Sequence, residues 1–90
     1  MNWREALLDR IPKIGMVVTV RHDLKSGNYL GNCTVSEMIG MAGQQVVITH
    51  IVNAVRGPNR EDLEGVNINV TASHYHWTPF MFEEWKHLYP

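Results

Sequence analysis

The fold is decided by one stretch of the chain, Gln45-Val46-Val47-Ile48-Thr49-His50-Ile51-Val52, which has the strongest strand character in the sequence. It is rich in β-branched residues, which favour the extended backbone of a sheet. Its side chains alternate between two faces, with Val46 and Ile48 on one face and Val47 and Ile51 on the other. The segment therefore predicts a central strand that contributes one face to the core.

Three further segments have strand character on either side of it. Residues 15–21 are rich in β-branched side chains that follow a glycine, and residues 66–71 alternate apolar valine and isoleucine with asparagine and threonine. After a break at Ser73, residues 74–77 form a fourth short strand. Four short strands on local connections favour an antiparallel sheet curled into a small, partly open barrel. The alternative is a four-stranded sheet with helices packed on one face.

Short helices are predicted between and around these strands. Residues 2–11 repeat apolar side chains at helical spacing before Pro12 ends them, and Thr34 with Glu37 has the spacing of a capping box for a helix over 35–41. Residues 61–65 are acidic and are predicted as a solvated turn. The chain is thus one domain, 1–90, with an N-terminal helix (1–12), a barrel (13–78) and a C-terminal helix (79–90).

Composition limits the kind of protein this is. A chain of 90 residues with 44% hydrophobic and 19% charged residues has the composition of one small globular domain. The size excludes barrel enzymes and doubly wound two-domain folds. The net charge of −1 offers no excess of positive charge for neutralising phosphates. Residues 1–25 carry a net charge of +2 and residues 56–90 a net charge of −2, so the charge is mildly uneven.

Targeting features point to the cytoplasm. Early charged residues such as Arg4 and Asp9 interrupt the apolar run that a secretion signal needs, and no stretch is long and apolar enough to cross a membrane. The single cysteine, Cys33, has no intramolecular partner, which suits a reducing compartment. We therefore expect a cytoplasmic protein.

A family resemblance covers about two thirds of the chain. The residues that carry it are Ile14-Gly15 with Val18, Val20-Arg21 with Asp23-Leu24, Tyr29, Met38 before Gly43, Val47-Ile48-Thr49, and Trp77-Thr78 followed by Met81-Phe82. In this order they resemble the small SH3-like barrel proteins of bacteriophages and prophages of low-GC Gram-positive bacteria. The chain departs from the family pattern at Met16, and its segment 53–71 is longer. The resemblance implies an SH3-like barrel and a mobile-element origin, but it carries no catalytic motif.

The candidate binding residues gather around the long loop 22–33. Tyr29 lies among Ser, Gly and Asn residues there, and in SH3-like barrels this loop borders the binding groove, so Tyr29 with Trp77 is predicted to form a shallow aromatic platform. Arg21 and Lys25 would add positive charge beside it, and Asp23 would fix the start of the loop. Arg21, Asp23, Lys25, Tyr29 and Trp77 are therefore the predicted binding residues.

Two functions compete for this surface. The first is a non-enzymatic binding module that engages a host or phage protein through the loop or an exposed edge strand, without a cofactor. The alternative is a nucleic-acid-binding accessory protein that uses Arg21, Lys25 and Tyr29. A homodimer formed through edge strands and apolar helix faces also remains open.

A histidine metal site is the weaker alternative. His74 and His76 are two residues apart, so on a strand both imidazoles would point to the same face. Zinc would need at least one or two more ligands, for which the possible residues are His50, Cys33, Asp23 and Glu83, but none lies at a recognised metal-binding spacing. Two exposed histidines that flank Tyr75 are the simpler interpretation.

Overall fold

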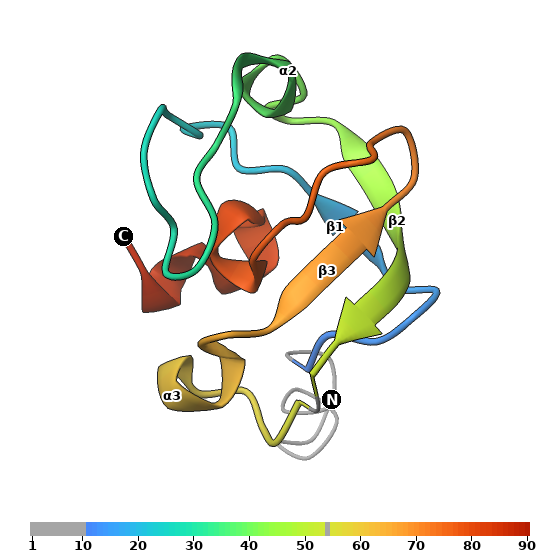
Figure 1. Ribbon diagram of the computed structural model, residues 1–90, viewed down its shortest axis with the longest axis vertical. Coiled ribbons are helices and arrows are strands. Elements are labelled where there is room, and N and C mark those ends of the chain that lie inside the picture. Colours follow the sequence, from blue (N-terminus) through green and yellow to red (C-terminus); the bar gives the residue numbers. More distant parts are fainter. Residues whose placement is uncertain (1–10, 54) are drawn as a thin grey trace, which may run out of the picture.

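The computed structural model describes residues 11–53 and 55–90 and shows a three-stranded antiparallel open sheet with a few short helices (Figure 1). The strands, in spatial order, are β1 (Val17–Thr19), β2 (Gln45–Val52) and β3 (Asn67–Val70). The helices are α2 (Ser36–Ile39), α3 (Arg60–Leu63) and two 3₁₀ helices, η1 (Pro79–Met81) and η2 (Glu83–Leu88). The predicted class, mainly β with short helices, is confirmed at this level.

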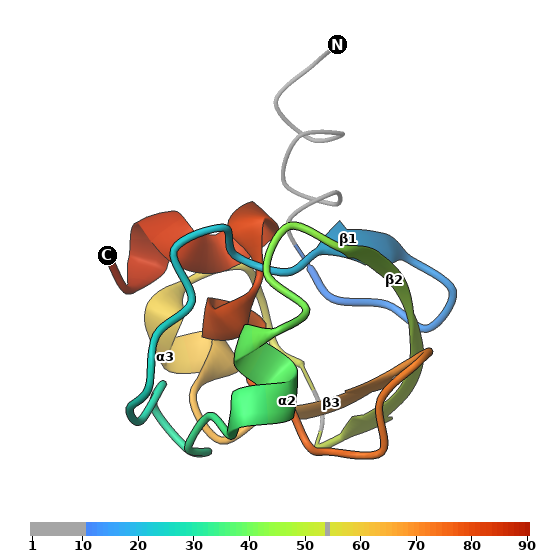
Figure 2. The same ribbon diagram turned by 90° about the horizontal axis from the view of Figure 1, so that it is seen from above.

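Strand β2 is central, because its two halves pair with different partners. Its first half pairs with β1, with Val17 opposite Val47, and its second half pairs with β3, with Ile51 opposite Ile68. The register shifts between Ile48 and His50, which marks a β-bulge. A bulge bends a strand and increases its twist. The sheet accordingly curves from β1 through β2 to β3 (Figure 2).

The outer edges of β1 and β3 both meet the last quarter of the chain. Val20, next to β1, forms an antiparallel bridge with Phe82, and Ile68 of β3 forms one with Trp77. The amide N–H of Ile68 donates to the Trp77 carbonyl at 2.7 Å, and that of Trp77 donates back at 2.8 Å. The strand predicted over 74–77 is wrong beyond this bridge, because the Tyr75 amide donates to the Ser73 hydroxyl at 3.2 Å in a turn.

The core lies between the inner face of the sheet and the C-terminal aromatic residues. The alternation predicted for two strands is confirmed, since Val18 and Val20 on one and Val66, Ile68 and Val70 on the other are buried. The largest fully buried side chains come from the C-terminal segment, namely Trp77, Phe80, Phe82 and Trp85. These rings supply much of the apolar area in a small core.

Helix α2 is shorter than predicted, and its capping box is absent. Val35, not Thr34, precedes the first turn. The Thr34 hydroxyl instead donates to the carbonyl of Lys25 at 2.8 Å and accepts the amide N–H of Gly27 at 3.0 Å. Glu37 accepts from the Ser36 hydroxyl at 3.3 Å. The hydroxyl expected at the helix end therefore stabilises the preceding loop.

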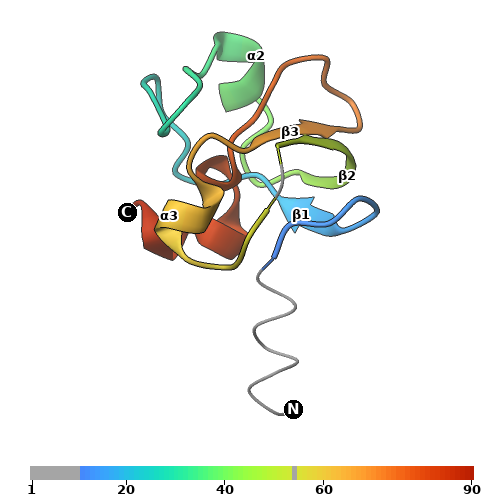
Figure 3. The same cartoon turned by 60° about the horizontal axis from the view of Figure 1, so that its bottom comes forward.

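Helix α3 replaces the solvated acidic turn predicted over 61–65. Asp62 accepts the Asn59 amide N–H at 3.3 Å at the start of the helix, and Leu63 is fully buried. Burial of Leu63 supplies the tertiary packing that so short a helix needs. Figure 3 shows α3 beside the C-terminal segment, where the Arg60 guanidinium lies 5.5 Å from the ring centre of Tyr89.

The predicted C-terminal helix is two 3₁₀ helices and not one α-helix. Phe82 separates them in an extended conformation, with φ −116° and ψ 148°. That conformation lets Phe82 bridge to Val20, so a sheet-like contact interrupts the helix. The helix predicted over 1–12 falls mostly on residues 1–10 and lies outside the described residues.

Candidate functional site

Arg21 lies shortly after the end of β1, where the long loop begins, and its side chain points inward. The residue is only 4% exposed. Its Nε and Nη2 each donate to one carboxylate oxygen of Asp23, both at 2.9 Å, in a bidentate ion pair. This is the geometry in which a planar guanidinium matches a carboxylate best. The prediction that Arg21 adds positive charge to the surface is therefore wrong.

The remaining side of the Arg21 guanidinium holds the C-terminal segment. Nη1 donates to the carbonyl oxygens of Phe80 at 3.1 Å and Tyr89 at 2.7 Å. Four of the five N–H groups that a guanidinium carries are thus engaged. Arg21 thus connects the start of the loop to Phe80 and Tyr89, which lie 59 and 68 positions farther along the chain. It acts as a structural clamp.

The clamp changes the pKa of Asp23. Hydrogen bonds from Arg21 are the main cause that lowers the pKa of the Asp23 carboxyl to about 2, from an ordinary value of 3.8. Asp23 in turn raises the pKa of Arg21. The carboxylate is the exposed partner of the pair, with 53% of its side-chain surface accessible. The outward charge of this pair is therefore negative.

Stability should fall in acid because of this pair. A carboxyl whose pKa is lowered by folding stabilises the protein above its unfolded pKa, and this contribution is lost as pH falls from about 4 towards 2. We expect Asp23→Asn to be less stable near pH 6 and to lose less stability across that window. Urea unfolding at a series of pH values measures this. Glu83, whose pKa is lowered by a hydrogen bond from Lys86, keeps its own contribution in both proteins. Parallel curves for the two proteins would contradict the assignment.

Tyr29 is part of a packed aromatic pair. It is 8% exposed, its hydroxyl accepts the Lys25 amide N–H at 3.1 Å, and its carbonyl accepts the Thr78 hydroxyl at 2.7 Å. Its ring centre lies 5.7 Å from that of Tyr89 and 5.3 Å from the guanidinium carbon of Arg21. Tyr89 donates from its hydroxyl to the Asn28 carbonyl at 3.2 Å. The two tyrosines therefore fix the loop against the C-terminal segment.

An open pocket of about 300 Å³ forms between these two segments. We call it the loop pocket, and its lining residues are Arg21, Asp23, Lys25, Ser26, Gly27, Asn28, Tyr29, Tyr89 and Pro90. Four of the five predicted binding residues lie together here. Tyr89 was not predicted, because no local signal in the sequence places the C-terminal segment against this loop.

Trp77, the fifth predicted residue, lies elsewhere. It is fully buried, its indole N–H donates to the Ser73 hydroxyl at 3.0 Å, and its ring packs 5.4 Å from that of Phe82. The predicted platform of Tyr29 with Trp77 does not form. Trp77 faces inward because its backbone bridges to the buried Ile68, which fixes the direction of its side chain.

The loop itself is held by its own hydrogen bonds. Asn28 bridges to Cys33, and the Asn28 side-chain oxygen accepts the Gly31 amide N–H at 3.3 Å. Leu30, with φ 58°, and Gly31, with φ 146°, make the tight turn between them. The pocket wall is therefore a hydrogen-bonded hairpin-like loop, which can present side chains in fixed positions.

The other candidates from the sequence are dispersed. His74 and His76 are exposed, and Cys33 is an exposed free thiol. Within residues 11–53 and 55–90, no three His, Cys, Asp or Glu side chains come together as metal ligands. A search of the same residues found no helix with the length and apolar character to cross a membrane.

Comparisons with family models, curated proteins and solved structures found no match to this chain.

Proposed function

We propose that this protein is a non-enzymatic binding module that engages a protein partner through the loop pocket. The observation that carries the proposal is the construction of the pocket from two segments far apart in the chain, clamped by Arg21. A site fixed in this way loses little conformational entropy when a partner binds. The partly exposed Tyr89 with its polar border is also favourable for peptide binding, because tyrosine is enriched among the residues that anchor protein interfaces.

We also propose that the fold is an SH3-like barrel. The bridges of Val20 with Phe82 and of Ile68 with Trp77 support it, because residues 77–82 then connect the free edge of β3 to the free edge of β1. The 3₁₀ helix η1 lies between these two bridging points. This order of pairings would close the curved sheet into a small barrel.

The same bridges favour the pocket over an edge strand as the docking surface. The outer edge of β1 is met by a carboxylate, since Glu84 accepts the Thr19 amide N–H at 3.0 Å. The outer edge of β3 is met by Trp77. A partner that added a strand at either edge would have to displace these contacts.

A protein partner is favoured over nucleic acid by the charges at the pocket. Arg21 is buried and engaged, so Lys25 is the exposed cation among the lining residues, and Asp23 is an exposed anion beside it. Strong binding to phosphates needs several free cations. The mixed charge of the pocket instead fits polypeptide side chains of either sign.

Selection from a random peptide display library tests the proposal. Peptides enriched on the wild-type protein are expected to bind at least tenfold more weakly to Lys25→Glu and to Ser26→Tyr, which place a reversed charge and a bulky ring in the loop pocket. Glu61→Gln, on the exposed surface of α3, is the matched control and should bind within twofold of the wild type. Backbone amide NMR spectra confirm that each variant is folded.

Two outcomes would overturn the proposal. Peptides that bind both pocket variants as tightly as the wild type would place the binding surface elsewhere. Salt-sensitive binding of a short single-stranded oligonucleotide that Lys25→Glu abolishes, without any enriched peptide, would favour the nucleic-acid alternative.

A further inference from the structure

Three polar residues form a row across the outer face of the sheet. His50 of β2 lies opposite Asn69 of β3 in the antiparallel register. On the other side of β3, Ile68 bridges to Trp77, and both of these side chains are buried. Asn69 and His76 are the next residues outward from this antiparallel bridge, and His76 is exposed where Trp77 is buried, so we infer that Asn69 and His76 lie near each other on the outer face. The row is therefore His50, Asn69 and His76.

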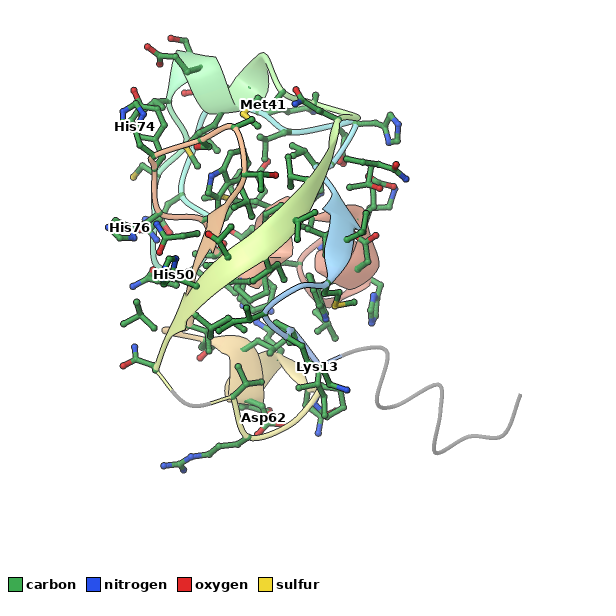
Figure 4. The ribbon with its side chains drawn as sticks, turned by 90° about the vertical axis from the view of Figure 1, so that its right-hand side faces the viewer. Lys13, Met41, His50, Asp62, His74 and His76 are labelled. Carbon is green, nitrogen blue, oxygen red and sulfur yellow. The ribbon has the colours of Figure 1, made fainter. Side chains whose placement is uncertain are left out.

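The two histidines are exposed at this face, and Asn69 is partly exposed between them. Figure 4 shows His50 and His76 projecting from the same side of the molecule, with His74 farther along that side. The pair that the fold brings together is thus not His74 with His76. The chain turns at residues 71–75, and the His74 ring instead contacts Tyr75, with 4.3 Å between ring centres.

We propose that His50 and His76 form a two-imidazole site for a divalent transition-metal ion such as Zn²⁺, Ni²⁺ or Cu²⁺. These ions favour imidazole nitrogen, at about 2.0–2.1 Å for zinc. Segments on either side of one strand lie about 9–10 Å apart, a span that two imidazoles leaning over Asn69 would bridge through one shared ion. Water completes the coordination. This proposal is independent of the loop pocket, to which neither histidine belongs.

The position of Asn69 provides a gain-of-function test. A carboxylate at this point of the row would lie between the two imidazoles and supply a third ligand. Asn69→Asp is therefore expected to bind Zn²⁺ at least tenfold more tightly than the wild type. Asn67→Asp is the matched control, because residue 67 lies on the same strand opposite Val52, and its acceptor oxygen still serves Asn32.

The experiment titrates untagged full-length protein with zinc chloride and follows binding by calorimetry and histidine side-chain NMR. His50→Gln and His76→Gln are expected to weaken binding at least tenfold, whereas His74→Gln and His87→Gln should stay within twofold. The NMR signals of His50 and His76 should shift together at the lowest zinc concentrations.

Several results would overturn the proposal. Equal losses from all four histidine variants would mean dispersed, adventitious binding. Asn69→Asp and Asn67→Asp with equal affinity would mean that residue 69 does not lie between two ligands. Binding that survives His50→Gln unchanged in a folded variant would also exclude the paired site.

Discussion

Replacing Trp77 with alanine is expected to lower the free energy of unfolding by about 3–5 kcal/mol, the range for truncating a fully buried aromatic residue. Trp77 is completely buried, packs against Phe82 and donates its indole N–H to Ser73. Small domains have about 5–15 kcal/mol of stability in total, so much of the fold depends on this one side chain. Urea unfolding followed by circular dichroism measures the change.

Two further variants make the result interpretable. Trp77→Phe keeps most of the ring and loses the hydrogen bond to Ser73, so its cost should be clearly smaller. Val17→Ala removes apolar atoms at a position that is 55% exposed and should change stability by less than about 0.5 kcal/mol. A cost for Trp77→Ala as small as that of Val17→Ala would contradict the core assignment.

Arg21→Met is expected to lower the free energy of unfolding by about 2–4 kcal/mol. The substitution removes the donors to the carbonyls of Phe80 and Tyr89 and leaves Asp23 unpaired. Buried acceptors that lose their donor retain the cost of desolvation, which is why the loss exceeds the net value of one hydrogen bond. Denaturant unfolding gives the stability. Hydrogen exchange should show faster exchange at the Tyr89 amide.

Variants of the neighbouring charged residues are the controls for the effect of Arg21→Met on stability. Lys25→Met removes an exposed cation from the same pocket and should leave stability nearly unchanged. Asp23→Asn keeps both bonds from Nη1 to the carbonyls, so its effect should lie between those of the other two variants. If Arg21→Met were as stable as Lys25→Met, Arg21 would not hold the C-terminal segment.

The strands were the part of the fold most accessible from sequence. The bounds of β2 follow the run Gln45–Val52, and the buried faces of β1 and β3 follow the alternation of valine and isoleucine. The alternation of apolar and polar residues is a local signal that predicts the buried face of a strand, because one face of the sheet packs on the core. What it does not reveal is that β2 pairs with β1 up to Val47 and with β3 from Ile48 onward, since that depends on two distant strands.

The helices show how tertiary contacts override a local motif. Thr34 and Glu37 have the spacing of a capping box, but the Thr34 hydroxyl forms its hydrogen bonds with Lys25 and Gly27 in the loop instead. Asn59 and Asp62 have similar chemistry and do begin a helix, because Leu63 can be buried there. Both segments carry a capping signal, and the available core decides between them.

The candidate site was also predictable from the sequence only in part. Arg21, Asp23, Lys25 and Tyr29 could be grouped because they lie within one loop, so proximity in sequence implies proximity in space. Tyr89 could not, because it reaches the loop from 68 residues beyond Arg21. The burial of Arg21 was missed for the same reason: its acceptors are backbone carbonyls, which carry no residue-specific signal.

Arg21 and Tyr89 lie far apart in the chain and meet only in the folded protein. Binding of a ligand in the loop pocket is therefore coupled to folding. The pocket exists only when residues 89–90 have docked on the loop that begins at Arg21, so a ligand there binds the native state and not a partly folded one. Such a ligand adds to the global free energy of unfolding by mass action, by about 2.7 kcal/mol at a concentration 100 times its Kd. For a protein of this size, binding of a partner would then contribute a substantial fraction of the total free energy of unfolding.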